Sequence, residues 1–146
     1  MRETFVAIDT LLTKNMQKYG ISILRISLSI VFIWFGVLKI IDATPVADLI
    51  QSTYPFLPEP LFIRFLGVWE VIIGVGLLFK LFLRITLLLL WIQMGGIFFG
   101  FFVSPSLYLV DGNFFLLNVY GEFVIKNIVL IAASLVVGGK ELRKLR

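Results

Sequence analysis

Neither cysteine nor histidine occurs in the 146-residue sequence, and charged residues make up only 15 % of it. Without cysteine the chain has no disulfide, no thiolate nucleophile and no c-type haem attachment site. Without either residue it lacks the commonest ligands of transition metals. We therefore expect no metal site, no catalytic residue and no redox centre carried by the chain itself, and the sequence disfavours an enzymatic activity of its own.

Apolar residues are correspondingly abundant, at 60 % of the sequence, against about 45–50 % in soluble domains. A chain with so few charges cannot cover a water-exposed surface with polar groups. The composition therefore predicts an integral membrane protein whose first partner is the lipid bilayer. The formal net charge is +4, but the basic residues lie beside apolar segments, where they orient a membrane protein. Nucleic-acid binding is not expected.

Four segments are long and apolar enough to cross the membrane as helices of about 20 residues. They run from about 21 to 41, 61 to 81, 85 to 103 and 119 to 138. Polar or small residues recur on each segment at three- and four-residue steps, which lets helices approach closely on one face. The predicted fold is an all-α bundle of four transmembrane helices, forming a single domain over residues 1–146.

The basic residues predict the orientation of this bundle, because lysine and arginine stay on the cytoplasmic side. They occur before the first span, between the second and third, and after the fourth (Arg2, Lys14, Lys18, Lys80, Arg84, Lys140, Arg143, Lys144 and Arg146). The two longer loops carry acidic residues instead (Asp42, Asp48, Glu59 and Asp111). We therefore expect cytoplasmic N and C termini and a multi-pass protein of the inner, or cytoplasmic, membrane.

Three segments outside the spans have patterns of their own. Residues 1–20 are an amphipathic cytoplasmic segment, for which a helix over residues 3–18 on the membrane surface and a disordered tail are both open. In the first outer loop, Thr44 and Pro45 predict the start of a short interfacial helix. In the second, over residues 104–120, Asp111 and Gly112 are a hairpin turn signal. A loop that dips into the interface is the alternative there.

One ionisable residue, Glu70, interrupts the apolar stretch FLGVWEVIIGVGLLF at residues 65–79. A charge within the membrane costs roughly 2.5–3.5 kcal/mol on insertion scales and usually faces the interior of a bundle. At a rise of 1.5 Å per residue, Glu70, Gln93, Lys126 and Asn127 all lie roughly 10–15 Å below the outer ends of their spans. These four residues are therefore predicted to form one polar layer near the midplane, as a candidate ligand-binding site.

The expected partner of the Glu70 carboxylate is Lys126, the only cation at the same depth. Glu122 lies four residues before Lys126 and is a rival partner for it. Lys39, near the outer mouth, and Arg25, in the inner third, are secondary polar residues that we expect to snorkel toward the head groups. The layer has two interpretations: a buried clamp that fixes helix packing, or a site for a proton, an ion or the polar head of a ligand.

Three blocks of sequence resemble the DoxX-like superfamily of small four-span membrane proteins. They are LRISLSIVFIWFGVLK (24–39), LGVWEVIIGVGLL (66–78) and GEFVIKNIVLI (121–131). The chain looks closest to the YkgB/RclC-type branch of inner-membrane proteins linked to reactive-chlorine resistance. It departs from the family pattern at Glu122, where arginine is usual, and at Asn127, where aspartate is usual. The resemblance implies the four-span fold and a link to quinone-linked sulfur oxidation or oxidative-stress resistance.

These observations leave three functions open. The first is a membrane component of a redox or oxidative-stress resistance system that binds a quinone-like or lipid head group at the polar layer. The second is a structural or assembly partner of another membrane protein. The third is a transporter or channel for small solutes or ions, for which homo-oligomers would be needed because four short spans leave little room for a water-filled path.

Overall fold

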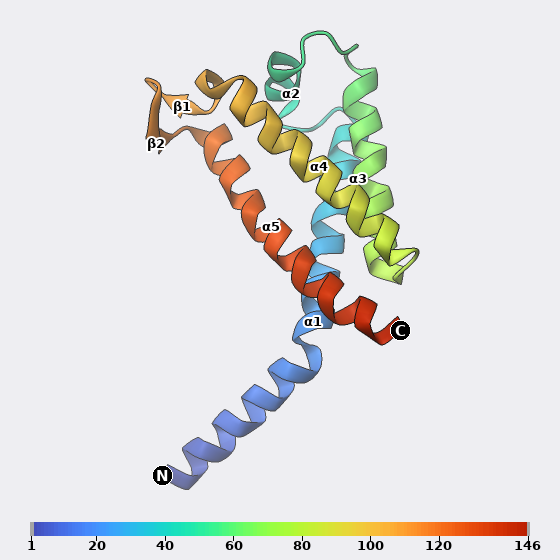
Figure 1. Cartoon of the computed structure of the whole chain (residues 1–146), viewed down its shortest axis with the longest axis vertical. Helices are drawn as coiled ribbons and strands as arrows, with labels where there is room; N and C mark the ends of the chain where they lie inside the picture. Colours follow the sequence, from blue (N-terminus) through green and yellow to red (C-terminus); the bar gives the residue numbers. More distant parts are fainter. Residues whose placement is uncertain (1, 146) are drawn as a thin grey trace.

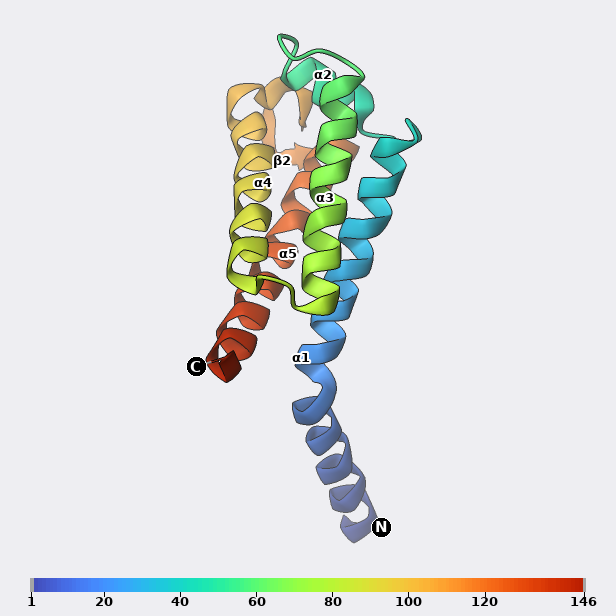
Figure 2. The same cartoon turned by 90° about the vertical axis from the view of Figure 1, so that its right-hand side faces the viewer.

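The computed structural model describes residues 2–145. Four long helices make up most of it: α1 (Arg2–Ile40), α3 (Leu61–Phe79), α4 (Leu83–Val103) and α5 (Val119–Glu141). They pack together as one bundle (Figures 1 and 2). All four are long and apolar enough to cross a membrane, which confirms the predicted all-α four-helix architecture. Met1 and Arg146, the ends of the predicted domain, lie outside the described residues.

The two ends of the bundle are built differently. One end carries the connections 41–60 and 104–118, and we call it the loop end. The opposite end carries the short connection between α3 and α4 and the C-terminal 3₁₀ helix η2 (Leu142–Leu145), and we call it the turn end. The N-terminal part of α1 extends beyond the turn end (Figure 2).

α1 is a single helix of 39 residues, although the predicted first span begins only near residue 21. Its first half projects away from the other helices (Figure 2), and apolar side chains such as Phe5, Leu11 and Met16 are exposed there. The amphipathic segment is therefore helical rather than a disordered tail. It continues directly into the span without a break in the helix, and its position on the membrane surface stays a prediction.

α1 and α3 form the closest helix pair of the bundle, and small residues make this possible. A Cβ atom added to Gly36 would lie 2.6 Å from the carbonyl oxygen of Gly67, and one added to Gly67 would lie 2.6 Å from the carbonyl oxygen of Gly36. One side of the same interface is tied by Ser29, whose Oγ donates to the carbonyl of Gly74 at 2.6 Å. These contacts fix the heights of the two antiparallel helices relative to one another.

Arg25 lies in this interface near the turn end, where it is 7 % exposed. Its Nη1 donates to the carbonyl oxygens of Leu77 at 2.5 Å and Leu78 at 2.6 Å. The last carbonyls of a helix lack intrahelical partners and carry a partial negative charge, so the guanidinium satisfies the C-terminus of α3. The expectation that Arg25 snorkels to the head groups is therefore wrong.

The apolar core occupies the half of the bundle nearer the turn end (Leu28, Phe32, Ile73, Leu77, Leu83, Leu87, Leu90, Met94, Ala133 and Val137). α3 and α4 touch there, because Gly76 leaves room for Thr86: an added Cβ would lie 2.4 Å from Thr86 Oγ1. Toward the loop end the two helices diverge, and the short helix α2 (Ala47–Thr53) lies between their ends (Figure 1).

α2 begins later than predicted, because Val46 rather than Thr44 is its N-cap. The backbone N–H of Ile50 donates to the carbonyl of Val46 at 3.0 Å, so the first helical hydrogen bond falls after the turn at Pro45. The short helix itself is present in the first loop, as expected. Its buried residues Leu49 and Thr53 face the bundle.

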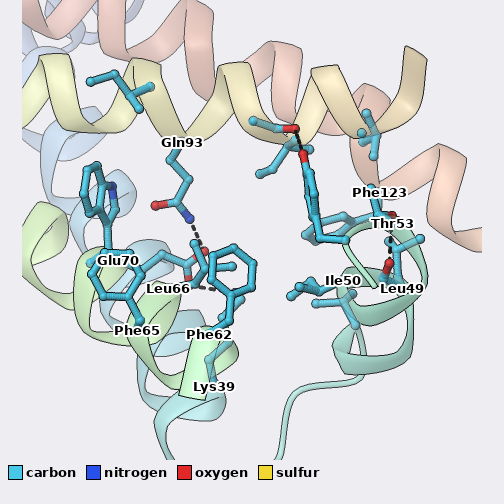
Figure 3. A pocket seen from close by; sticks show the side chains of 18 of the residues that line it. Lys39, Leu49, Ile50, Thr53, Phe62, Phe65, Leu66, Glu70, Gln93 and Phe123 are labelled. Atoms are coloured by element: carbon cyan, nitrogen blue, oxygen red, sulfur yellow. Dashed lines mark hydrogen bonds and ion pairs between the residues drawn. The ribbon is translucent and has the colours of Figure 1, made fainter. Parts of the chain in front are cut away.

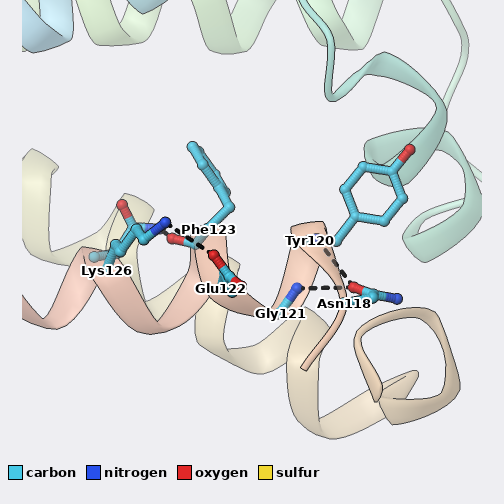
Figure 4. Close-up of polar contacts among 7 residues, drawn as sticks. Asn118, Tyr120, Gly121, Glu122, Phe123 and Lys126 are labelled. Carbon is cyan, nitrogen blue, oxygen red and sulfur yellow. Dashed lines mark hydrogen bonds and ion pairs between the residues drawn. The ribbon is translucent and has the colours of Figure 1, made fainter. Parts of the chain in front are cut away.

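The second loop contains a hairpin, which is one of the two conformations left open by the sequence. After the 3₁₀ helix η1 (Pro105–Leu107), strand β1 (Leu109–Val110) pairs antiparallel with β2 (Asn113–Leu117). Asp111 and Gly112 have φ angles of 50° and 72°, as the two central residues of a tight hairpin turn require. Asn118 then caps α5, and its Oδ1 accepts from the N–H groups of Tyr120 and Gly121, each at 3.0 Å (Figure 4).

Candidate functional site

Glu70 is buried on α3 with hydrogen-bonding partners from two other helices. Its Oε2 lies 2.7 Å from Nζ of Lys39 on α1, and its Oε1 accepts a hydrogen bond from Nε2 of Gln93 on α4 (Figure 3). Lys39 and Glu70 are each only 6 % exposed. We call Lys39, Glu70 and Gln93 the polar triad. It joins three of the four long helices through one carboxylate.

The direction of the helices explains why Lys39 reaches Glu70. Gly36 lies beside Gly67, and the two helices are antiparallel. Lys39 follows Gly36 by three residues and Glu70 follows Gly67 by three residues, so their backbones are separated by roughly 9 Å along the helix axes. A helical side chain tilts toward the N-terminus of its own helix. Lys39 therefore leans toward the turn end and Glu70 toward the loop end, so the two side chains approach each other across this distance.

The predicted pairing of Glu70 with Lys126 is wrong. Lys126 Nζ lies 3.1 Å from Oε2 of Glu122 instead, and the lysine side chain is 75 % exposed (Figure 4). On α5 the same tilt directs Lys126 back toward Glu122, one turn nearer the helix N-terminus. The pairing of Lys126 with Glu122, which the sequence offered as the alternative, is the observed one. Lys126 and Glu70 were predicted to lie at the same depth in the membrane, but equal depth does not bring their side chains together.

Asn127 also lies apart from the polar triad, although it is buried at 4 % exposure. Its Nδ2 donates to the carbonyl of Phe123 in the preceding turn of α5, at 3.2 Å. Of the predicted layer, the structure thus brings together Glu70 and Gln93 and leaves Lys126 and Asn127 on α5. Lys39, expected only as a secondary residue, occupies the place predicted for Lys126.

A cavity of about 290 Å³ lies beside the polar triad, toward the loop end (Figure 3). Most of its wall is apolar, and aromatic side chains contribute much of it. Side chains from α2, α3, α4 and α5 line it (Val46, Leu49, Ile50, Phe62, Phe65, Leu66, Trp69, Ile92, Ile97, Phe123 and Val124). The triad supplies charged and amide groups to the same wall, so the cavity combines an apolar body with a small polar patch.

Tyrosine and threonine side chains close the cavity toward the loop end. The hydroxyl of Tyr54 donates to the carbonyl of Gly96 on α4 at 2.8 Å, and Thr53 Oγ1 lies 3.1 Å from the hydroxyl of Tyr108. Burial raises the pKa of Tyr54, with a smaller contribution from Tyr108, so its hydroxyl stays protonated and remains a donor. α2 is thereby tied to α4 across the top of the cavity.

The sequence matches the DoxX family over residues 20–103. This segment covers more than half of the chain. The chain belongs to the DoxX family. No curated protein and no solved structure matches it.

The matched DoxX segment contains all three residues of the polar triad, Lys39, Glu70 and Gln93. Glu122, Lys126 and Asn127 follow the matched segment. The two departures from the family pattern noted at Glu122 and Asn127 therefore lie outside it and outside the triad. The closer affiliation with the YkgB/RclC-type branch stays a prediction.

One polar atom of the DoxX triad is left without a partner. Gln93 Oε1 is buried and accepts no hydrogen bond from the residues that the structure describes. The orientation of the amide follows from chemistry, because an ionised carboxylate such as Glu70 only accepts and must face the Nε2 side. In Figure 3 the amide oxygen of Gln93 points away from Glu70. Gln93 thus contributes its Nε2 to the triad, while its oxygen lies buried on the far side of the amide.

The cavity reaches the outer surface of the bundle between α3 and α4. Phe65 on α3 and Ile92 on α4 line it and are 53 % and 54 % exposed. Gly96 lines the same side, and a Cβ added there would meet no atom within 4 Å. Farther from the loop end, Trp69 Nε1 donates to the carbonyl of Leu89 at 3.3 Å and links the two helices. The opening thus faces the region that membrane lipids occupy.

Proposed function

We infer that this DoxX protein is a membrane component of a redox or oxidative-stress resistance system, and that it binds a quinone-like or lipid head group in the cavity beside the polar triad. The observation that carries this inference is the cavity itself, whose otherwise apolar wall includes the buried ion pair and Gln93. Ligand sites typically combine apolar walls with a few convergent polar groups.

The make-up of the cavity wall indicates what fills it. Water is a poor occupant, because it needs two to four polar partners and most of this wall is apolar. An amphiphile from the bilayer satisfies both parts of the site, with its tail against the apolar wall and its head at the triad.

The surroundings of the triad favour a binding site over a simple packing clamp. A buried ion pair can often be replaced by apolar residues without loss of stability, so structure alone is a weak reason to retain one. A clamp would be enclosed by packed side chains on every side. Here Lys39, Glu70 and Gln93 all line the cavity.

The proposed location is the inner, or cytoplasmic, membrane with both termini in the cytoplasm, as the basic residues indicate. In that orientation the loop end faces outward. The cavity then lies in the outer half of the bilayer, with α2 above it. A ligand would reach the opening between α3 and α4 from the outer leaflet.

A role as an assembly partner of another membrane protein is the second candidate, and one observation favours it. The N-terminal part of α1 projects beyond the bundle and exposes apolar residues, among them Phe5, Leu11 and Met16. Such a surface suits a partner helix as well as a membrane surface. The third expectation, an oligomeric transporter or channel, stays a prediction.

The proposed binding can be tested by extracting and identifying the molecules that co-purify with the protein in nanodiscs. We expect the wild type to retain a quinone or a lipid enriched over the bulk membrane. Gly96→Leu should lose this molecule, because the new side chain occupies the cavity. Gly95→Leu is the matched control, since Gly95 does not line the cavity and has the same free space. Equal composition in all three samples would exclude a ligand site here.

A further inference from the structure

We propose a second site, at the turn end between α4 and α5, where Arg84 and Arg143 hold the phosphate head of an anionic phospholipid. It lies toward the opposite end of the bundle from the cavity beside the polar triad. The two sites share no lining residue, so this one does not depend on the proposed function.

A second cavity lies where the end of α5 passes the start of α4, as both views of the bundle show (Figures 1 and 2). We call it the turn-end cavity, and its volume is about 480 Å³. Arg84, Trp91, Leu135, Gly139 and Arg143 are among the residues that line it. Gly139 keeps part of it open, because a Cβ added there would meet no atom within 4 Å.

The two ends of the turn-end cavity differ in polarity. α4 runs away from the turn end and α5 runs toward it, so Arg84 and Arg143 lie at the membrane surface. Trp91 and Leu135 lie roughly 10–12 Å deeper at 1.5 Å per residue. The one polar group of Trp91, its Nε1–H, donates to Ser134 Oγ at 2.9 Å. A wall that is cationic at the surface and apolar below it matches a phospholipid, with its phosphate above and its chains below.

The charge of the head follows from the ion pairs at the turn end. Arg25 donates to the last carbonyls of α3, and Lys80 pairs with Glu141 at 2.7 Å. Arg84 and Arg143 are exposed, and neither side chain has an ion pair or hydrogen bond with any residue that the structure describes. No aspartate or glutamate lines the described cavity. Two uncompensated cations beside one cavity select an anion.

The chemistry of arginine favours phosphate among the anions. A guanidinium group presents a planar fork of N–H donors that fits the oxygens of a phosphate. Basic pockets between transmembrane helices on the cytoplasmic side bind anionic lipid heads. The preference of basic residues for the cytoplasm accounts for arginines at this end, but it does not require two of them to line one cavity. A free phosphate has the same head chemistry and lacks the chains that the deeper wall accommodates.

The test measures lipid binding to the purified protein by native mass spectrometry. Phosphatidylglycerol and phosphatidylcholine are the probes, because both contain a phosphate and only the first has a net negative charge. We expect phosphatidylglycerol to bind the wild type more tightly. Arg84→Gln and Arg143→Gln should each weaken its binding about fivefold, as is typical for a basic residue at an anionic membrane surface. Both arginines are exposed, so thermal unfolding of these variants should match the wild type.

Matched variants separate a built site from general attraction. Lys140→Gln removes an exposed cation at the same end that does not line the turn-end cavity, and should change binding less than about twofold. Gly139→Leu should remove the preference for phosphatidylglycerol, because the new side chain fills the cavity. Gly95→Leu has the same free space outside the cavity and should have no effect. A lipid beside the polar triad would be insensitive to all of these changes.

Four results would overturn the proposal. Equal binding of the two lipids to the wild type would show that the site does not select charge. An effect of Lys140→Gln as large as that of either arginine would reduce the site to general attraction. Unchanged binding in Gly139→Leu would place the lipid elsewhere. If soluble glycerol phosphate binds as tightly as phosphatidylglycerol, the site takes a free phosphate and the lipid assignment is wrong.

Discussion

Removing the ammonium of Lys39 should destabilise the bundle more than any change at Lys126. In Lys39→Met, the carboxylate of Glu70 stays buried at 6 % exposure and keeps only its hydrogen bond from Gln93. Breaking one side of a buried pair typically costs about 3–5 kcal/mol. Lys126→Met breaks an exposed pair between neighbouring turns of one helix, which is typically worth about 0.3–0.5 kcal/mol. The loss in the free energy of unfolding should therefore be about tenfold larger for Lys39→Met than for Lys126→Met.

The double variant Lys39→Met, Glu70→Leu shows how much of this loss comes from the isolated charge. It removes both ionic groups and leaves Gln93 without its partner, which costs about 1–3 kcal/mol for an unsatisfied buried group. We therefore expect the double variant to be more stable than Lys39→Met alone. Reversible unfolding in mixed micelles of a mild detergent and dodecyl sulfate measures these free energies.

Two results would refute this reasoning. If Lys39→Met costs no more than Lys126→Met, the ion pair with Glu70 does not form in the membrane protein. If the loss of stability in the double variant equals the sum of the losses measured for Lys39→Met and for Glu70→Leu separately, Lys39 and Glu70 are not coupled.

The remaining predictions concern orientation, packing and the cover of the cavity. In this cysteine-free chain, Asp48→Cys should react with an impermeant thiol reagent on intact cells and Lys140→Cys should not; the reverse pattern would invert the topology. Gly36→Leu should prevent folding or cost several kcal/mol, roughly as for overpacked cores, because its Cβ would lie 2.6 Å from the carbonyl of Gly67; unchanged unfolding would mean that α1 and α3 are not in close contact. Tyr54→Phe should lose about 0.5–1.5 kcal/mol with its hydrogen bond to α4 and increase proteolysis of the first loop, and equal cleavage rates would show that α2 is held by other contacts.

The helices could be predicted from the sequence because length and apolarity alone decide whether a segment crosses a bilayer. The hairpin at Asp111 and Gly112 could be offered as one of two alternatives, because the residues of a tight turn are a signal in the local sequence. The start of α2 was predicted a few residues too early. Thr44 and Pro45 are typical of a helix start, but the helix begins after Val46, which is its N-cap.

The candidate site was only partly predictable. The depth of a residue in the membrane can be estimated from the sequence, but which side chains meet depends on how the helices pair. Glu70 and Gln93 were placed correctly beside each other by depth. Lys39 was predicted only as a secondary polar residue and missed as the partner of Glu70, because its backbone lies near the loop end and snorkelling was assumed to carry its ammonium outward. Its tilt toward its own helix N-terminus would have indicated the opposite direction. The cavity depends on the divergence of α3 and α4, for which no local signal exists.

Exchanging the two charges tests the ion pair of the triad. In the variant Lys39→Glu, Glu70→Lys, the side chains still tilt toward each other, so the ion pair should re-form and the double variant should be more stable than Lys39→Glu alone. A lysine at position 70 only donates, so the amide of Gln93 must turn its oxygen toward it.

Reversible unfolding of the single and the exchanged variants measures this order. An exchanged variant that is no more stable than Lys39→Glu alone would show that positions 39 and 70 do not face each other in the bundle.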